Sequence, residues 1–137
     1  MKKISLNGDW KLYYYDKLQR NVIDPDELRV GDIPSVKATV PGDVHLDLSR
    51  AGILPEDLFK GMNIRETELF ETYDWWYEKE FTLSDIPAGK KITLKFEAVD
   101  CLVHLSNQHQ LDIAQQNVIS YSYYHFYDFL TWFLSSF

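Results

Sequence analysis

The chain has 137 residues, about the size of one domain, and its formal net charge is −7. An acidic protein repels the phosphate backbone, so the composition argues against a nucleic-acid partner, while a neutral ligand such as a sugar is compatible with it. No apolar run reaches the ~18 residues of a transmembrane helix, so no membrane partner is predicted. The start, MKKISLNGDW, lacks the apolar stretch of a secretory signal, which predicts a cytoplasmic protein.

Two strands are predicted before residue 41. Residues 9–16, DWKLYYYD, are aromatic and bounded by an Asn-Gly pair and a polar run, which is typical of a strand. Residues 17–35 contain two prolines and a glycine among mixed charges, and they are predicted to form a loop. Residues 36–40, VKATV, alternate apolar and polar side chains, which predicts a strand with one solvent-exposed face.

A short helix is predicted directly after these strands. Asp43 is the expected N-cap, because a carboxylate there accepts hydrogen bonds from the first turn. Gly52 stands where a left-handed residue ends a helix, and Pro55 prevents continuation. The pattern therefore predicts a helical insert of about two turns. Its buried face is expected to carry Val44, Leu48 and Ala51, with Leu46 beside them.

Two longer strands follow an irregular crossing segment at residues 56–72. Residues 75–83, WWYEKEFTL, and residues 91–99, KITLKFEAV, both alternate with a period of two. Because only about eight residues connect them, we expect these strands to pair antiparallel. The first strand is expected to have a wet face and a core face, with the aliphatic stem of a lysine lying along the core. The core face carries Trp75, Tyr77, Lys79, Phe81 and Leu83.

The chain changes character near Cys101. All 14 Lys and Arg residues precede it, and only Asp112 and Asp128 are charged after it. Residues 121–137, YSYYHFYDFLTWFLSSF, are aromatic without a basic residue, which predicts a poorly packed, aggregation-prone tail with an open strand edge. The competing interpretation is an apolar helix over about residues 126–134 that docks on the rest.

No metal or cofactor site is predicted. The four histidines, His45, His104, His109 and His125, lack the spacing of a metal motif, and the five-residue spacing of His104 and His109 is a weak signal. No glycine-rich phosphate loop occurs. The lone Cys101 cannot form an internal disulfide, and we interpret it as a small buried apolar residue.

Two side-chain groups invite a functional interpretation. Glu78 and Glu80 share a strand face and could approach the separation of about 5–9.5 Å that glycoside hydrolysis requires. We favour solvated charges on the wet face, where glutamate usually lies. Of the adjacent tryptophans, Trp75 is expected in the core and Trp76 to be less buried. Trp76 is a candidate sugar contact, although we favour a structural role in covering a neighbouring element.

Four stretches carry a resemblance to a known family. LNGDWKL, ATVPGDVHLDLSRAGILPEDLF, DWWYEKEFTL and KKITLKFEAVDC occur in this order and at this spacing over residues 4–101. They resemble the N-terminal domain of glycoside hydrolase family 2, and most of all its β-mannosidase branch. After Cys101 the similarity weakens, since Gln108 stands where the family has a turn glycine and Ser120 where proline is usual.

The resemblance implies an all-β fold, a jelly-roll β-sandwich of the galactose-binding-like type with a short helical insert. We expect residues 1–120 to form this domain, incomplete at its C-terminus, and residues 121–137 to be an aberrant aromatic tail. In the family, an immunoglobulin-like domain and a (β/α)₈ barrel follow, and the barrel carries the two catalytic glutamates of a retaining mechanism. Those domains are the expected missing partners, and the chain alone is not expected to catalyse.

Three functions are therefore to be separated. The first is the non-catalytic N-terminal fragment of a β-mannosidase-like enzyme that hydrolyses terminal β-D-mannose residues of oligosaccharides, with β-mannosides reached through the parent enzyme. The second is a free-standing carbohydrate-binding module. The third is a non-functional remnant of a truncated gene.

Overall fold

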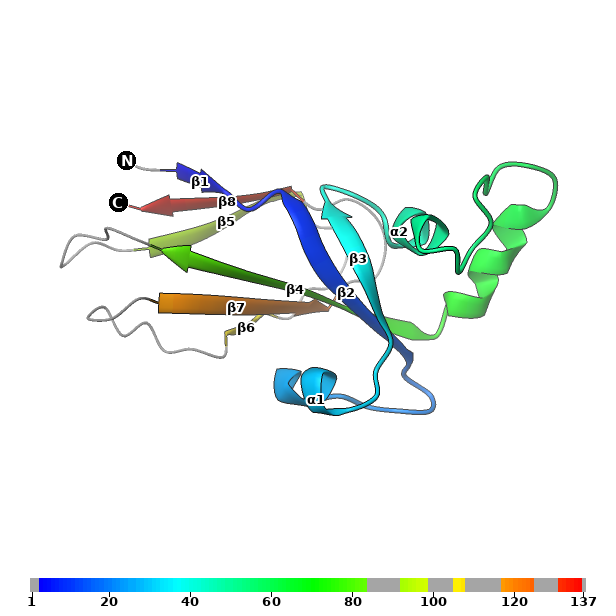
Figure 1. The fold of residues 1–137 in the computed structure, drawn as a ribbon, viewed down its shortest axis with the longest axis horizontal. Helices are drawn as coiled ribbons and strands as arrows, with labels where there is room; N and C mark the ends of the chain where they lie inside the picture. Colours follow the sequence, from blue (N-terminus) through cyan, green and yellow to red (C-terminus); the bar gives the residue numbers. More distant parts are fainter. Residues whose placement is uncertain (1–2, 84–91, 99–104, 108–116, 125–130, 137) are drawn as a thin grey trace.

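The computed structural model describes residues 3–83, 92–98, 105–107, 117–124 and 131–136. Within them, strands form a three-stranded sheet of order β1-β8-β5 and a five-stranded sheet of order β3-β2-β4-β7-β6, antiparallel throughout (Figure 1). The predicted all-β fold is confirmed, whereas the jelly-roll connectivity stays a prediction. The strands are β1 (Lys3–Ser5), β2 (Gly8–Asp16), β3 (Ser35–Val40), β4 (Tyr73–Leu83), β5 (Ile92–Ala98), β6 (Leu105–Asn107), β7 (Asn117–Tyr124) and β8 (Thr131–Ser136).

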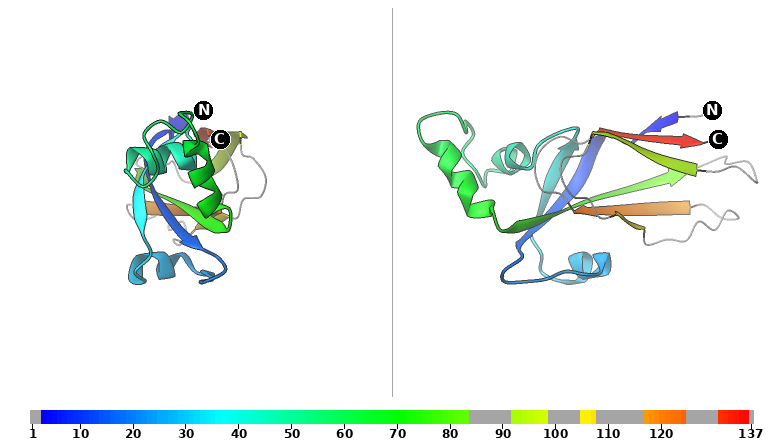
Figure 2. Two further views of the ribbon diagram at one scale, coloured as in Figure 1. Left: turned by 90° about the vertical axis from the view of Figure 1, so that its right-hand side faces the viewer. Right: turned by 180° about the vertical axis from the view of Figure 1, so that it is seen from behind.

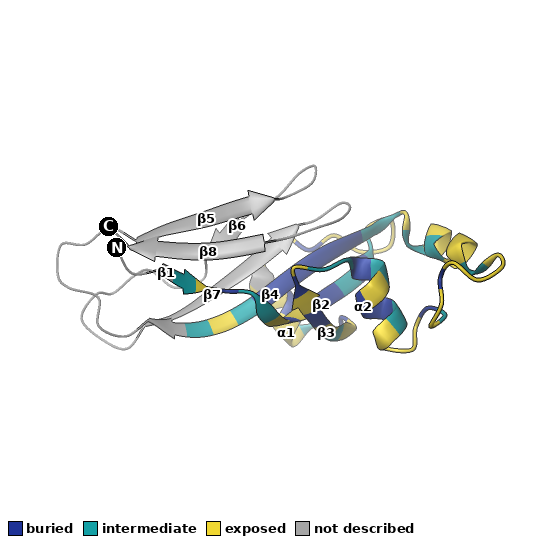
Figure 3. Cartoon of the chain, turned by 90° about the horizontal axis from the view of Figure 1, so that it is seen from above, coloured by how far each residue is buried: buried dark blue, intermediate teal, exposed yellow. Residues whose placement is uncertain are grey.

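Strands β2 and β4 form the middle of the larger sheet and organise its core. They pair antiparallel, with Leu12 opposite Tyr77 and Tyr14 opposite Trp75. Both strands lie where the sequence predicts them, β2 from its aromatic content and flanking turn signals and β4 from its alternation. Residues on one face of these strands form the main core together with the helix that follows β3. Figure 3 shows the buried positions along the two strands and this helix. This core contains Leu6, Trp10, Leu12, Ala38, Val40, Val44, Leu48, Leu54, Leu58, Trp75 and Tyr77.

Helix α2 (Val44–Arg50) covers this face of the sheet, and its ends are those predicted. The Asp43 carboxylate accepts hydrogen bonds from the backbone of the first turn, at 2.7 Å from His45 and 3.1 Å from Leu46. At the other end Gly52 has φ 75°, and the last carbonyls are satisfied by the two bonds of a Schellman motif. Val44 and Leu48 are buried as predicted. Ala51 is exposed, so its predicted place on the buried face is wrong.

Helix α1 (Pro25–Val30) lies within the segment predicted to be a loop, so that prediction is wrong. A capping box begins it: the Asp24 side chain accepts from the Asp26 backbone N–H, and the Glu27 carboxylate accepts from the Asp24 N–H at 3.0 Å. With proline in the first turn, this is a recognisable start signal. The helix covers the sheet face opposite α2 (Figures 1 and 2) and forms a second cluster. That cluster contains Tyr13, Tyr15, Val22, Leu28, Ile33 and Trp76.

Strands β4 and β5 do not pair, contrary to the expectation from their short connection. β4 lies between β2 and β7 in the larger sheet, whereas β5 pairs with β8 in the smaller one. The two strands therefore belong to different sheets. Alternation and loop length alone do not distinguish a hairpin from a connection that crosses between two sheets, which explains the error.

The crossing segment before β4 contains regular structure that was not predicted. Residues Asn63–Phe70 form a 3₁₀-helix, η1, which lies far from the smaller sheet (Figure 1). None of its residues is buried, so apolar periodicity could not have marked it. Phe70 returns to the body, where its ring lies 4.9 Å from that of Tyr73 and 6.0 Å from that of Trp75.

The aromatic tail contributes strands to both sheets. Its first residues end β7, between β4 and β6, and Thr131–Ser136 form β8, between β1 and β5. The alternative of a helix over residues 126–134 is therefore wrong for its second part. Poor packing, aggregation and a domain boundary after residue 120 stay predictions.

Trp75 provides a test of the main core. Its side chain is 4 % exposed and contacts the rings of Tyr14, Phe70 and Tyr73, with an edge contact to His45. We expect Trp75→Ala to lower the free energy of unfolding by about 3–5 kcal/mol, because it leaves a large cavity. Urea denaturation measures this change. Leu69→Ala, at a 72 % exposed position, is the control and should change stability by less than about 0.5 kcal/mol. Equal effects of the two substitutions would contradict the assigned core.

Candidate functional site

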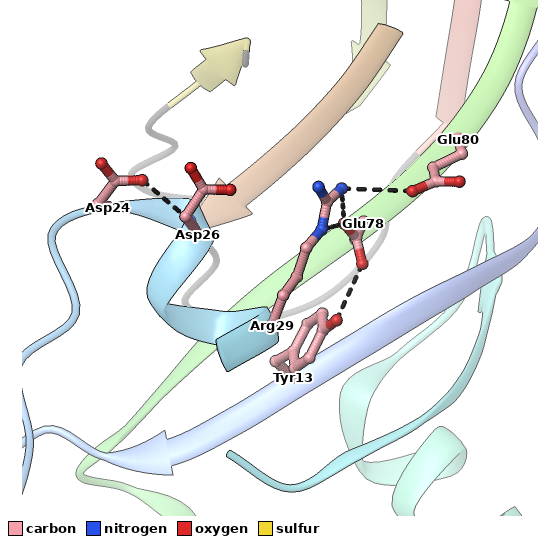
Figure 4. A network of polar contacts seen from close by, with 6 residues as sticks. All are labelled: Tyr13, Asp24, Asp26, Arg29, Glu78 and Glu80. Atoms are coloured by element: carbon pink, nitrogen blue, oxygen red, sulfur yellow. Dashed lines mark hydrogen bonds and ion pairs between the residues drawn. The ribbon is translucent and has the colours of Figure 1, made fainter. Parts of the chain in front are cut away.

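A network of charged side chains joins α1 to the sheet (Figure 4). Glu78, on β4, accepts two hydrogen bonds at Oε1 from the Arg29 guanidinium, the one from Nε at 2.6 Å. Its other oxygen accepts from the Tyr13 hydroxyl at 3.0 Å. Arg29 also reaches Glu80, whose Oε1 lies 3.4 Å from Nη2. One guanidinium thus bridges the two carboxylates singled out as a possible catalytic pair.

The structure separates Glu78 and Glu80 by environment. Glu78 is only 9 % exposed, so the expectation that it is a solvated charge is wrong. The reason is α1, which covers this part of the strand and was not predicted. Glu80 lies beyond the helix with 64 % of its side chain exposed, as expected for a solvated acid.

The network holds its donors in their protonated forms. Burial alone would lower the pKa of Arg29, but hydrogen bonding and the charges of Glu78 and Glu80 outweigh it, so the pKa is raised. Burial chiefly raises the pKa of Tyr13, with a further contribution from Glu78. The phenol therefore remains a donor at neutral pH. Both carboxylates are engaged by Arg29, so the network supports the packing of α1 and offers no separate acid and base.

An open cleft with a volume of about 340 Å³ lies beside this network. Its size is within the range of small-molecule sites, about 300–1,000 Å³. The cleft offers cationic donors, carboxylate acceptors and one phenol, a set suited to hydroxyl groups rather than to apolar ligands. Its lining comprises Lys11, Tyr13, Leu28, Arg29, Gly31, Ile33, Ser35, Glu78 and Glu80.

Trp76 lies beneath α1 in the second cluster, where 1 % of its surface is exposed. The expectation that it is less buried than Trp75 is therefore wrong. Its indole N–H donates to the Tyr15 hydroxyl at 3.1 Å, and that hydroxyl donates to Asp74 at 3.4 Å. The ring covers a neighbouring element, as the favoured interpretation predicted. A sugar contact at Trp76 stays a prediction, and it would require α1 to move.

Asp47 is a buried acid that was not predicted from the sequence. It lies on α2 with 1 % of its surface exposed. Its Oδ1 accepts from the Thr39 backbone N–H at 3.2 Å and from Arg50 at 3.0 Å, while Oδ2 has no hydrogen-bond partner among the described residues. Burial raises the pKa of this carboxyl to about 6, although both donors oppose the shift. The signal was a charged residue between two apolar ones on the buried side of a helix.

Other parts of the described chain offer less chemistry. A pocket of about 70 Å³ beside His45 and Trp75 is well below the ~300 Å³ usual for ligand sites. Among the described residues, no group of three or more His, Cys, Asp or Glu side chains could hold a metal ion. Cys101, His104, His109 and His125 lie outside the described residues. No described helix is long and apolar enough to cross a membrane.

Residues 17–123 match the family model described as the glycosyl hydrolase 2 galactose-binding domain-like family. The match includes both α-helices and, of the larger sheet, β3, β4, β6 and all but the last residue of β7, while β2 precedes it. Because it covers well over half of the chain, the protein belongs to this family. The membership agrees with the galactose-binding-like fold predicted from the sequence motifs.

Two proteins with sequences similar to this chain are named as β-mannosidases. The chain is 34 % identical over 80 residues to a probable beta-mannosidase of Caenorhabditis elegans, and 31 % identical over 80 residues to beta-mannosidase B of Emericella nidulans. These alignments cover 57 % and 58 % of this chain but only 9 % of each relative. The chain thus corresponds to a small part of either protein.

The fold also matches a solved structure. The crystal structure of β-D-mannosidase from Dictyoglomus thermophilum superimposes with a TM-score of 0.54 at 22 % identity. The match covers 99 % of this chain and 15 % of that one. At this identity the similarity shows the fold alone.

The Asp47 carboxyl predicts a pH dependence of stability. The pKa of this carboxyl is about 6 in the folded protein, against an ordinary value of 3.8. Because the folded protein binds this proton more tightly than the unfolded chain, the protonated carboxyl stabilises the fold fully below about pH 4. This stabilisation is lost as the pH rises through 6. We expect Asp47→Asn to remove a decrease in the free energy of unfolding of up to about 3 kcal/mol between pH 4 and pH 7. Urea denaturation at several pH values tests this, with Glu56→Gln as the exposed control. Parallel profiles for Asp47→Asn and the wild type would contradict it.

The Arg29 bridge predicts unequal effects at its two carboxylates. Arg29→Met leaves Glu78 buried without its guanidinium, which should lower the free energy of unfolding by about 1–3 kcal/mol. Glu80→Gln should cost less than about 0.5 kcal/mol, because exposed ion pairs contribute little. The double variant Arg29→Met, Glu78→Gln should lose less than the sum of its single variants in the same urea assay. An Arg29→Met variant no less stable than Glu80→Gln would refute a supporting role for the bridge.

Proposed function

We propose that this chain is the non-catalytic N-terminal domain of a β-mannosidase-like glycosidase that hydrolyses terminal β-D-mannose residues of oligosaccharides. The observation that carries the proposal is the family match over residues 17–123, together with two relatives named as β-mannosidases. The domain would be a piece of an enzyme that works in the cytoplasm and reaches β-mannosides through its other domains. Residues 1–120 would form the domain proper, and residues 121–137 its aberrant end.

The polar network supports a non-catalytic assignment. A retaining glycosidase requires a nucleophile and an acid about 5–5.5 Å apart across the sugar bond, with the acid protonated. Here Glu78 and Glu80 both accept hydrogen bonds from Arg29, and Glu78 also accepts one from the Tyr13 hydroxyl. The proposal therefore assigns the catalytic carboxylates to a separate barrel domain of the parent enzyme, as the family resemblance implies.

A second candidate function is a free-standing carbohydrate-binding module. The cleft beside Tyr13 and Arg29 favours it, because its size and its mixture of donors and acceptors suit a sugar. Calorimetric titration with mannose and β-1,4-mannobiose tests this candidate. Binding that is weakened by Lys11→Ala would support it, and Ser35→Ala in the same cleft would show whether hydroxyl contacts contribute. A protein that binds neither sugar and supports no enzyme would be the non-functional remnant.

A chimera tests the enzyme-domain proposal. This chain replaces the matching 15 % of the solved β-mannosidase, and the deletion mutant lacking that part is the control. We expect the chimera to hydrolyse an aryl β-mannoside and the deletion mutant to be inactive or unstable. A chimera no more active or stable than the deletion mutant would count against the proposal.

The isolated chain should not turn over an aryl β-mannoside. The physical reason is that both candidate carboxylates are held by Arg29 in a structural bridge. The measurement is release of the aryl alcohol by rigorously purified protein, with Glu78→Gln and Glu80→Gln as matched variants. Turnover that either substitution abolishes would overturn the assignment.

A further inference from the structure

The segment over residues 51–72, here called the arm, extends away from both sheets (Figures 1 and 2). Its base is held in the main core by Leu54 and Leu58, which are 4 % and 5 % exposed. Between Phe59 and Leu69 no side chain is buried, and η1 lies within this part. The arm is thus attached at its ends and has no core of its own.

The outer part of the arm carries large apolar side chains that face solvent. Phe59 is 87 % exposed, Met62 65 %, Ile64 47 % and Leu69 72 %. Isolated exposed apolar residues are ordinary, but four large ones within so short a segment form the kind of surface that proteins use for association. Phenylalanine and methionine are also among the residues enriched at interfaces.

Local hydrogen bonds hold this surface in shape. The Asn63 side-chain amide donates to the Asp57 carbonyl at 2.8 Å, and the Asp57 carboxylate accepts from the Phe59 N–H at 3.0 Å. The Thr67 hydroxyl donates to the Ile64 carbonyl at 2.7 Å. At 8 residues, η1 is long for a 3₁₀-helix, whose runs seldom exceed about four. A preformed surface loses less conformational entropy when a partner binds.

We propose that the arm is the surface on which the catalytic portion of the β-mannosidase-like enzyme docks, an inference that rests on the proposed function. The relatives contain ample polypeptide for this role, because the chain covers only 9 % of each named relative and 15 % of the solved enzyme. The partner is a folded protein surface with an apolar centre into which Phe59 and Met62 insert.

The charges around the arm favour this occupant over a second copy of the chain. The arm contains five acids and two bases, so it is acidic as a whole and is complementary to a basic partner surface. Two copies of the arm would bring like charges together, which costs association energy. The acids are Glu56, Asp57, Glu66, Glu68 and Glu71, and the bases are Lys60 and Arg65.

Thiol labelling of the chimera described above tests the proposal. Phe59→Cys and Met62→Cys are made in the isolated full chain and in the chimera, and the rate of alkylation at each site is followed by peptide mass spectrometry. Val30→Cys is the matched control, because Val30 is 85 % exposed but lies at the end of α1. We expect labelling at positions 59 and 62 to slow by about tenfold or more in the chimera, since a covered site reacts only when it opens. Labelling at position 30 should be unchanged.

Each outcome bears on the docking surface separately from the enzyme function. Equal labelling of positions 59 and 62 in the isolated chain and the chimera overturns the docking surface, and if that chimera hydrolyses β-mannoside the proposed function stands. Protection in an inactive chimera supports docking while the proposed function fails. Labelling of the isolated chain that slows at these two positions as its concentration rises identifies a second copy as the occupant and also overturns the proposal.

Discussion

Coverage of both faces of the β2–β4 pair is the constraint on which the rest of the structure depends. One face of these strands joins Trp75 and Tyr77 to α2 in the main core, and the other joins Trp76 to α1. Apolar burial is the main stabilising term available to a chain of this size without a metal or a disulfide among its described residues. The central strands can therefore be aromatic on both sides without exposing a sticky face.

The same arrangement requires two short helices to remain packed on the sheet, and each is joined to it by the hydrogen bonds of one buried carboxylate. Helices of 6 and 7 residues are too short to be stable by themselves. Glu78 on β4 accepts from Arg29 of α1, and Asp47 of α2 accepts from the Thr39 backbone of β3. These bonds join each helix to the sheet. They differ in completeness, because both Glu78 oxygens are satisfied and the Asp47 Oδ2 has no partner among the described residues.

Local signals in the sequence predicted more of the fold than of the site. Alternation located β3 and β4, aromatic content between turn signals located β2, and Asp43 with Gly52 bounded α2. All of these are backbone and burial rules that act within a few residues. Strand pairing was less accessible, since the partner of β5 depends on β8 far along the chain. The environment of Glu78 was mispredicted for a related reason. Whether an acid on a strand is exposed or buried depends on the element that packs on it. For Glu78 that element is α1, and the segment that contains α1 and its capping box had been predicted to be a loop.

This division of roles bears on how the domain would contribute to an enzyme. The buried carboxylates Glu78 and Asp47 form hydrogen bonds that join α1 and α2 to the sheet. Glu78 is therefore not placed to act as an acid or a base in bond cleavage. The arm is the opposite case: its hydrogen bonds keep its shape, yet Phe59 and Met62 contribute nothing to the core and remain in water. Leaving such side chains exposed is unfavourable in a chain that functions alone. The unfavourable exposure disappears when another folded surface covers the arm, which agrees with a domain that supports catalysis carried out elsewhere.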